Sequence, residues 1–286
     1  MGRVAALPPE AVVGIIAGGG GLPAALRSHL LAAGAQCRVV ALAGEATLED
    51  TDSTRAIADV EGIFSDFETF GVTHAVLVGW VRRRPTLSEA RIGRRALRSV
   101  PRLLRALGRG DDAMLSAVVR ALEGRGMVVL GVHELWPEIV ATGGTLGHVE
   151  PGLEDDKSVE LGLRAARALG ALDAGQGVVV VGRRIVALEG LEGTAEMLER
   201  VAHLRATGRL KGKTPRGVLV KAAKPGQERR ADLPAIGSDT IAQVEAAGLR
   251  GIAVEAGSSL IIERERLIEA ANVAGVFVHA FEGAAA

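Results

Sequence analysis

The chain has 286 residues, of which 48% are apolar and 24% are charged, and its formal net charge at pH 7 is zero. This length and composition are typical of a soluble globular protein with one or two domains, and the neutral charge argues against a general nucleic-acid-binding protein. Cys37 is the only cysteine, which excludes an intrachain disulfide and is consistent with a reducing compartment. The longest apolar runs are far shorter than the roughly 18 residues of a membrane span, and the N-terminus has no secretory signal pattern. We therefore expect a cytoplasmic protein.

A glycine-rich loop lies near the N-terminus, between an apolar run at 12–17 and a segment with helical periodicity. It consists of four consecutive glycines: Gly18, Gly19, Gly20 and Gly21. A strand, a glycine loop and a helix in this order bring backbone N–H groups and a helix N-terminus close to a phosphate. Residues 19–24 match G-x-G-x-x-A, which is a weak signal alone. A structural turn without a ligand is the alternative interpretation.

The first half continues as an alternation of strands and helices. We expect strands at 37–43, 74–80 and 127–133, and a helix at 113–123 that follows Asp111 and Asp112. This alternation predicts a parallel sheet and a Rossmann-like domain. At least one of the two aspartates is expected to cap the helix, and the other is a candidate hydrogen-bond acceptor in a cleft. Glu45 follows the second strand, where a dinucleotide-binding fold has its ribose-binding acid.

A basic segment spans residues 82–109, with ten arginines and one acidic residue, Glu89. Its leucines recur at helical spacing and predict an amphipathic helix. Such a helix either packs on the core with its charged side in solvent or lies on an anionic membrane surface.

Periodicity is lost between residues 136 and 156, which contain many glycines, prolines and acids. We interpret this segment as an interdomain linker, with domains at 1–136 and 157–286 and the linker at 137–156. In the second domain we expect helices at 157–169, 195–204, 239–247 and 264–272, a hairpin at 178–188, and strands at 251–255, 259–262 and 276–279. The second domain is therefore α/β as well. A cleft between two domains is a common place for a long ligand.

A charged loop at 221–240 separates a β-branched run from a helix and contains two prolines and two glycines that favour turns. It contains Lys221, Lys224, Arg229, Arg230 and Asp232. Ammonium and guanidinium groups with one carboxylate suit a polyanionic substrate, with a cation bridging the acid to it. A solvated charged loop is the alternative.

Two further carboxylates, Glu189 and Glu192, lie among glycines, and Thr194 is expected to cap the helix at 195–204. Together with Asp232, these groups are of the type that binds Mg²⁺ or Mn²⁺. The six histidines form no H-x-x-H or H-E-x-x-H pattern. A G-x-S-x-G elbow and a GxxxxGK[ST] loop are also absent, which argues against an α/β-hydrolase and a P-loop NTPase.

Several motifs along nearly the whole chain resemble one family. They are GIIAGGGGLP at 14–23, GRGDDAML at 108–115, LDAGQGVVV at 172–180, ALEGLEGTAEML at 187–198, KxxKPxQxxR followed by DLPxIG at 221–237, and VEAGSSLIIERE at 254–265. In combination they resemble the LpxI-type UDP-2,3-diacylglucosamine pyrophosphatases of Gram-negative bacteria. The resemblance implies hydrolysis of UDP-2,3-diacylglucosamine to UMP and 2,3-diacylglucosamine 1-phosphate (lipid X), a step of lipid A biosynthesis, with the active site in the interdomain cleft.

The resemblance also implies roles for particular residues. Asp232 is expected to be the metal ligand or the base that orients water, with Mg²⁺ or Mn²⁺ as the cofactor. Lys221 and Lys224 are expected to bind the phosphates. Further substrate contacts are expected at the four glycines, which would contact UDP or its phosphates, and at Asp111, Glu189, Glu192, Thr194, Gln227 and Thr240.

Two other classes of function stay open at this stage. A nicotinamide-dependent oxidoreductase would use the glycine loop, although no partner motif with a catalytic His or Lys stands out. A non-catalytic protein that binds nucleotide-linked lipids would use the same residues without turnover. Expected partners are the glycolipid substrate, the inner face of the inner membrane through peripheral contact, and a second copy in a homodimer; no nucleic acid is expected.

Overall fold

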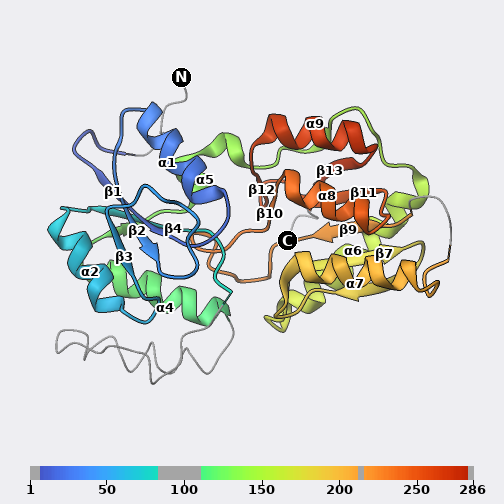
Figure 1. Cartoon of the computed structure of the whole chain (residues 1–286), viewed down its shortest axis with the longest axis horizontal. Helices are drawn as coiled ribbons and strands as arrows, with labels where there is room; N and C mark the ends of the chain where they lie inside the picture. The colour runs from blue at the N-terminus through green and yellow to red at the C-terminus, as the bar shows by residue number, and fades with distance from the viewer. Residues whose placement is uncertain (1–6, 83–110, 212–215, 283–286) are drawn as a thin grey trace. The chain divides into compact units, whose positions relative to one another are not determined.

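The computed structural model describes residues 7–82, 111–211 and 216–282 (Figure 1). The chain forms two compact units, the first containing residues 1–137 and 228–232, the second containing residues 138–227 and 233–286. The chain therefore returns from the second unit to the first for the short segment Glu228–Asp232. The basic segment expected at 82–109 lies outside the described residues, apart from Arg82.

The first unit is built on a five-stranded parallel sheet with the order β3-β2-β1-β4-β5. Its strands are β1 (Val12–Ala17), β2 (Gln36–Leu42), β3 (Ser53–Arg55), β4 (His74–Val78) and β5 (Val128–Val129). This order matches the first five strands of the 3-2-1-4-5-6 order of the Rossmann fold, which confirms the expected Rossmann-like parallel sheet. Ile15 of β1 pairs with Val39 on one side and Val76 on the other, and all three side chains are fully buried.

Helices cover both faces of this sheet, so the central strands β1 and β4 are almost entirely apolar. The helices are α1 (Leu22–Ala32), α2 (Val60–Thr69), α4 (Asp111–Glu123) and the short α5 (Val132–Leu135). Phe64 and Phe67 of α2 share a buried cluster with Leu122 of α4 and Val40 of β2, whereas α1 lies on the opposite face (Figure 1).

Two strands of the first unit are shorter than the sequence predicted. β4 ends before Gly79, which has a left-handed backbone with a φ of 97°, and Trp80 pairs with Gly19 only through an isolated bridge. β5 stops before Gly131, whose N–H donates to Oε2 of Glu134 at 2.7 Å and begins α5. The edge strand β3 was not predicted, because so short a strand leaves little periodicity to recognise.

The second unit contains a six-stranded mixed sheet, β6-β13-β11-β9-β7-β8, and a separate parallel pair of β10 and β12. The strands are β6 (Gly144–Leu146), β7 (Gly177–Val181), β8 (Arg184–Leu188), β9 (Val218–Lys221), β10 (Ala235–Ile236), β11 (Gly251–Glu255), β12 (Leu260–Ile261) and β13 (Phe277–Phe281). Strands β9, β11 and β13 are parallel to one another, and β7 runs antiparallel to both β9 and β8. The expected hairpin is confirmed as β7 and β8.

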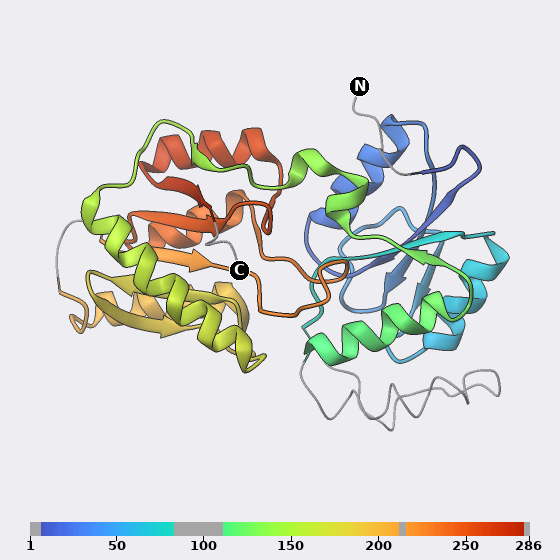
Figure 2. The ribbon, with the colours of Figure 1, turned by 180° about the vertical axis from the view of Figure 1, so that it is seen from behind.

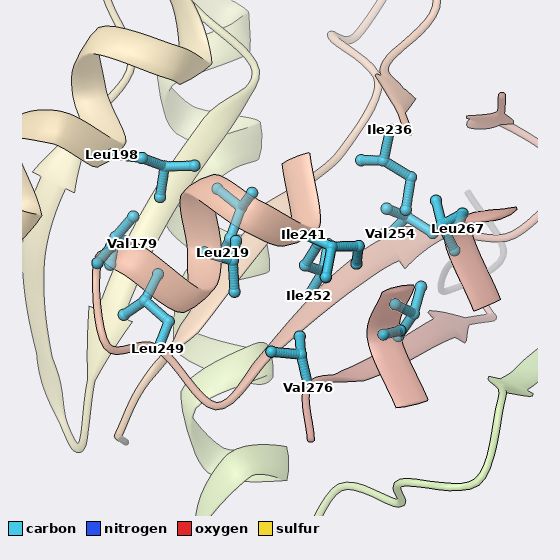
Figure 3. Close-up of a cluster of buried hydrophobic side chains, with 14 of the residues drawn as sticks. Val179, Leu198, Leu219, Ile236, Ile241, Leu249, Ile252, Val254, Leu267 and Val276 are labelled. Carbon is cyan, nitrogen blue, oxygen red and sulfur yellow. The ribbon is translucent and has the colours of Figure 1, made fainter. Parts of the chain in front are cut away.

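Helices α6 (Leu153–Ala171), α7 (Gly193–Ala206), α8 (Ser238–Ala246) and α9 (Arg264–Ala274) complete the second unit. The main core lies between the sheet and α7, α8 and α9, where Val179, Leu219 and Ile252 of the strands pack with Leu198 and Leu267 of the helices (Figure 3). Helix α6 covers the other face, as seen from behind in Figure 2. Among the helices of the described segments, none is both long and apolar enough to cross a membrane.

Part of the segment expected as a linker is structured. It contains the 3₁₀-helix η2 (Pro137–Ile139), the strand β6, which pairs antiparallel with β13, and the first turn of α6. Helix α6 begins earlier than predicted because Oδ2 of Asp155 accepts the N–H of Gly152 at 2.9 Å, and the acids of its first turn complement the helix dipole.

Candidate functional site

Polar residues gather at the carboxyl-terminal edge of the second unit's sheet. Strand β8 has the same direction as β9, β11 and β13, because β8 and β9 both run antiparallel to β7. Lys221 is the last residue of β9, Glu255 is the last residue of β11, and Glu189 follows β8. Ligands of open α/β sheets bind outside this edge. The edge is therefore the candidate site of the second unit.

Lys221 is a buried lysine with a neutral hydrogen-bond acceptor. The residue is 6% exposed, and Nζ donates to the carbonyl oxygen of Ala235 at 3.2 Å. Within the described segments, no carboxylate lies within ion-pair distance of Nζ. Lysine is almost never fully buried without an anionic partner, because removing an ammonium group from water is costly. The position therefore suits an anionic ligand.

Lys224 is held by a carboxylate that the sequence analysis did not identify. Its Nζ lies 2.9 Å from Oδ1 of Asp173, and its side chain is 8% exposed. Asp173 has a left-handed backbone with a φ of 51°, a conformation that is uncommon for residues other than Gly, Asn and Asp. The N–H of Lys224 donates to Oε1 of the buried Gln227 at 2.5 Å. The sequence signal that marked Asp173 was its place in the LDAGQG motif.

Glu189 and Thr194 form a hydrogen bond with each other near the carboxyl-terminal edge of the second unit's sheet. Glu189 is 7% exposed; its Oε2 accepts the N–H of Gln176 at 3.1 Å, and its Oε1 accepts the hydroxyl of Thr194 at 2.6 Å. The prediction that Thr194 caps the helix is wrong, because α7 begins at Gly193 and the hydroxyl is directed to Glu189 instead.

A metal site made by protein ligands alone is not formed among the described residues, since they contain no group of three or more His, Cys, Asp or Glu side chains placed to hold an ion. Both oxygens of Glu189 already accept hydrogen bonds. Glu192 forms an ion pair with Arg200 at 2.9 Å. Glu189 and Glu192 therefore do not fit the ligand role that their residue type suggested.

Asp232 groups with the first unit, whereas Lys221, Lys224 and Gln227 belong to the second. We call the segment Glu228–Asp232 the 228–232 turn. The N–H of Glu228 donates to Oδ1 of Asp112 at 2.6 Å, and its carbonyl oxygen accepts the N–H groups of Ala231 and Asp232, both at 3.0 Å. Asp112 thus accepts a hydrogen bond within the first unit, whereas the expected acceptor in a cleft stays a prediction.

Arg230 joins the 228–232 turn to α4. Its Nε and Nη2 each donate to the carboxylate of Glu228 at 2.8 Å, and its Nη1 donates to Oε1 of Glu123 at 2.7 Å. The Arg230 guanidinium lowers the pKa of Glu228, and the two carboxylates raise the pKa of Arg230. The sequence analysis identified neither Glu123 nor Glu228. Glu123 is 107 positions from Arg230, so no local pattern connects the two residues.

The glycine loop is shaped by Trp80. The N–H groups of Gly18 and Gly19 donate to the carbonyl oxygens of Val78 and Trp80, both at 2.8 Å. A Cβ atom on Gly18 would lie 2.5 Å from the Trp80 carbonyl oxygen, and one on Gly19 would lie 2.4 Å from the indole ring. Close packing therefore explains these two glycines without a ligand.

The other two glycines, Gly20 and Gly21, leave backbone donors at the start of α1. Neither N–H has a protein acceptor among the described residues, and Gly21 provides no side-chain cap for the helix. Nearby, the carboxylate of Glu45 accepts the N–H of Arg82 at 2.9 Å, and the Arg82 guanidinium lies 4.2 Å from the centroid of the Trp80 ring.

Two predicted substrate contacts remain, Thr240 and Asp111. The Thr240 hydroxyl accepts the N–H of Gly237 at 3.3 Å and so caps α8. Asp111 begins α4, but its side chain lies outside the described part of the chain.

The two units define an α/β protein. The second unit has the buried Lys221 and the largely buried Lys224 at the carboxyl-terminal edge of its sheet, and the first unit has a Rossmann-like sheet. Comparison with known proteins is more specific. The model of the LpxI N-terminal domain matches residues 12–139, and that of the LpxI C-terminal domain matches residues 142–279. The chain therefore belongs to the LpxI family.

A curated relative and a solved structure were also found. The UDP-2,3-diacylglucosamine pyrophosphatase LpxI of Caulobacter vibrioides is 39% identical over 269 residues, which cover 93% of this chain and 96% of the relative. Among solved structures, the UDP-glucose 4-epimerase of Thermus thermophilus in complex with NAD is 16% identical, with coverage of 95% of this chain and 85% of that chain. Its TM-score of 0.30 is too low to support a conclusion about this chain.

Proposed function

We propose that this chain hydrolyses the pyrophosphate bond of UDP-2,3-diacylglucosamine and releases UMP and 2,3-diacylglucosamine 1-phosphate, in lipid A biosynthesis. The observation that carries this proposal is the 39% identity to the Caulobacter enzyme over 93% of the chain, which spans both units. The buried lysines at the sheet edge of the second unit support it, because a diphosphate is a polyanion.

In this reaction the oxygen of a water molecule forms a bond to one phosphorus while the bridging P–O bond breaks. The electron pair of that bond leaves with the departing phosphate group, and the attacking water loses a proton. We assign Asp232 to orient the water and accept its proton, and Lys221 and Lys224 to offset the negative charge that spreads over the phosphoryl oxygens. Removing one such group commonly costs about a hundred- to a thousand-fold in rate.

The other predicted contacts take two kinds of role in this proposal. Gln227, Glu192 and Asp111 stay proposed substrate contacts. Glu189 and Thr194, which bond to each other, and Thr240, which caps α8, would support the site from behind. The open N–H groups of Gly20 and Gly21 at the N-terminus of α1 are the proposed UDP or phosphate contacts of the first unit, together with the adjoining Gly18 and Gly19.

We also propose Mg²⁺ or Mn²⁺ as a cofactor, with Asp232 as its single protein ligand and the substrate phosphates completing the coordination. Mg²⁺ commonly binds in this way, through one or two carboxylates and phosphate oxygens. When bound, the cation would neutralise charge on the diphosphate.

The test is a UMP-release assay with UDP-2,3-diacylglucosamine, with and without a chelator. We expect Asp232→Asn to lose about a hundred- to a thousand-fold in kcat while its melting temperature stays near that of the parent. Asp239→Asn, at an exposed position in the first turn of α8, is the matched control and should retain activity. Parent-like turnover of Asp232→Asn would remove Asp232 from the mechanism, and full activity in chelator would remove the cation.

Two alternative functions can be distinguished with the same purified protein. A nicotinamide-dependent oxidoreductase would be stabilised by NAD(H) or NADP(H) but not by UDP. A non-catalytic binding protein would retain UDP-2,3-diacylglucosamine tightly without releasing UMP.

We further propose peripheral contact with the inner face of the inner membrane. In the second unit, a hollow of about 380 Å³ is lined by Val181, Val186 and Leu210 and by the cations Arg184, Arg209 and Lys211. None of these three cations has an acidic partner among the residues that the structure describes. Apolar surface with several cations is typical of contact with anionic lipid, and each cation near such a surface contributes about 1 kcal/mol.

Vesicle sedimentation tests this contact. Replacing Arg184 and Arg209 together by Ser should weaken binding to phosphatidylglycerol vesicles, whereas Arg266→Ser, at an exposed position on α9, should not. Equal binding of all variants would exclude this surface. Cytoplasmic location, a homodimer and catalysis between the two domains stay predictions; sedimentation equilibrium would test the homodimer.

A further inference from the structure

Glu228 is the central residue of the 228–232 turn, because its N–H, its carbonyl oxygen and its carboxylate all form hydrogen bonds. Its N–H donates to Asp112, its carbonyl oxygen accepts the N–H groups of Ala231 and Asp232, and its carboxylate accepts Arg230. The backbone of Asp232 is therefore bonded directly to the residue on which the turn is organised. This set of bonds leaves Glu228 little freedom to move without displacing Asp232.

Helix α4 provides the other side of this network. Asp112 lies in its first turn, and Glu123, which accepts Nη1 of Arg230 at 2.7 Å, is its last residue. The backbone of Arg230 also lies close to Gly131, where an added Cβ would be 3.1 Å from its Cα. In addition, Ala231 packs against the buried cluster of the first unit. The turn is thus fixed at several points to α4 and to neighbouring parts of the first unit.

We propose that Asp112, Glu123, Glu228 and Arg230 are positioning residues that set the location of the Asp232 carboxylate for hydrolysis. This inference rests on the proposed function of Asp232. An isolated surface ion pair would contribute little, but the side chains of Glu228 and Arg230 are only 17% and 31% exposed, and the guanidinium is shared by two carboxylates.

The expected consequence is kinetic. The turn is a segment without regular secondary structure, so its geometry depends on these bonds rather than on a helix or sheet ladder. A misplacement of a reacting group by about 1 Å can cost on the order of a hundred-fold in rate. Loosening the network should therefore lower kcat while the groups that bind the diphosphate, and hence KM, change little.

A matched pair of arginine variants separates positioning from stability. Arg125 lies just beyond α4 and also bridges two carboxylates, Glu61 at 2.8 Å and Glu68 at 3.0 Å, with 18% side-chain exposure. Among the described residues, Arg125 has no hydrogen bond, ion pair or ring contact with the 228–232 turn. Arg125→Lys and Arg230→Lys keep the charge and remove the forked geometry in both cases.

For Arg230→Lys we expect kcat to fall by about ten- to a hundred-fold, with KM within about twofold and faster hydrogen exchange in a peptide containing Ala231 and Asp232. Arg125→Lys should keep the parent kcat. Glu123→Gln should lower kcat in the same direction, and combining it with Arg230→Lys should add little, because both break one bridge.

Asp232→Asn is included so that the two proposals can fail separately. Turnover in Asp232→Asn would overturn the role of Asp232 and, with it, this inference. If Asp232→Asn is inactive but Arg230→Lys and Glu123→Gln keep the parent kcat, the proposed function stands and the positioning role is wrong. Equal losses of kcat in Arg125→Lys and Arg230→Lys would likewise show that the effect is one of general stability.

Discussion

The ion pair between Asp173 and Lys224 gives a prediction whose size follows from burial. The Lys224 side chain is 8% exposed and that of Asp173 is 28% exposed, with 2.9 Å between Nζ and Oδ1. Breaking a fully buried pair costs about 3–5 kcal/mol, whereas an exposed pair contributes about 0.2–1 kcal/mol. For this intermediate case we expect Asp173→Asn to lower the unfolding free energy by about 2 kcal/mol, which for a chain of this size lowers Tm by roughly 4–8 °C.

The backbone of Asp173 allows a second, independent estimate. Its φ of 51° is in the left-handed region, which costs most L-residues about 1–2 kcal/mol. Asn tolerates this conformation, and Gly adopts it without steric strain. Asp173→Ala should therefore be less stable than Asp173→Asn by about 1 kcal/mol, and Asp173→Gly should recover part of that loss. All three variants should also lower kcat/KM, because Lys224 loses a carboxylate that orients it.

Circular dichroism is the assay for this series, since both tryptophans, Trp80 and Trp136, lie in the first unit and Asp173 lies in the second. Glu154→Gln is the control: its pair with Lys157 on α6 is exposed to solvent, so this substitution should change the unfolding free energy very little. A change of that small size for Asp173→Asn would refute the argument from burial. Equal stability of the Ala and Gly variants would refute the argument from backbone strain.

Three further predictions concern other parts of the chain. Gly19→Ala should destabilise the first unit by about 1–3 kcal/mol, measured by urea unfolding, because the new methyl group would meet the Trp80 ring. Glu189→Gln should lower both Tm and activity, because its two oxygens accept hydrogen bonds and an amide nitrogen cannot; a loss of activity at unchanged Tm would contradict this. The hydrogen bond from Arg55 lowers the pKa of Asp66 below its usual 3.8. The ionised carboxylate therefore stabilises the fold fully above pH 3.8, and this contribution is lost as the pH falls through the lowered pKa. The Tm difference between the parent and Asp66→Asn should accordingly be largest near neutral pH and shrink on acidification.

The parts of the fold that sequence predicts are those set by local pattern. The strand at 12–17, the hairpin at 178–188 and most helices of the second unit follow from apolar periodicity and turn residues, and the structure has them with small shifts at their ends. The ends move where a backbone or side-chain contact decides them, as at Thr194, where bonding to Glu189 replaces the expected cap.

The parts that sequence does not predict are contacts between distant positions. Lys224 and Asp173 are 51 positions apart, and Glu228 and Asp112 are 116 positions apart. The motifs identify these segments but do not show which of their residues contact each other. Such contacts depend on the tertiary fold, which leaves no periodic pattern in the sequence. The glycine loop is ambiguous for a different reason: glycine is required both for close packing and for access to a phosphate, so composition does not separate the two.

The contrast between the glycine loop and the buried lysine favours Lys221 as the stronger candidate for the proposed phosphate contact. Close packing against Trp80 explains part of the glycine run, so the number of glycines says little about a ligand. Lys221 has no such explanation: it ends a strand whose other residues are apolar and buried, and an apolar side chain there would avoid the desolvation of an ammonium group. With a lysine that is 6% exposed and bonded to one carbonyl oxygen, the fold is less stable than it would be with an apolar residue at position 221. An anion bound beside Lys221 would offset the desolvation cost of its ammonium group, and the diphosphate of the proposed substrate is such an anion.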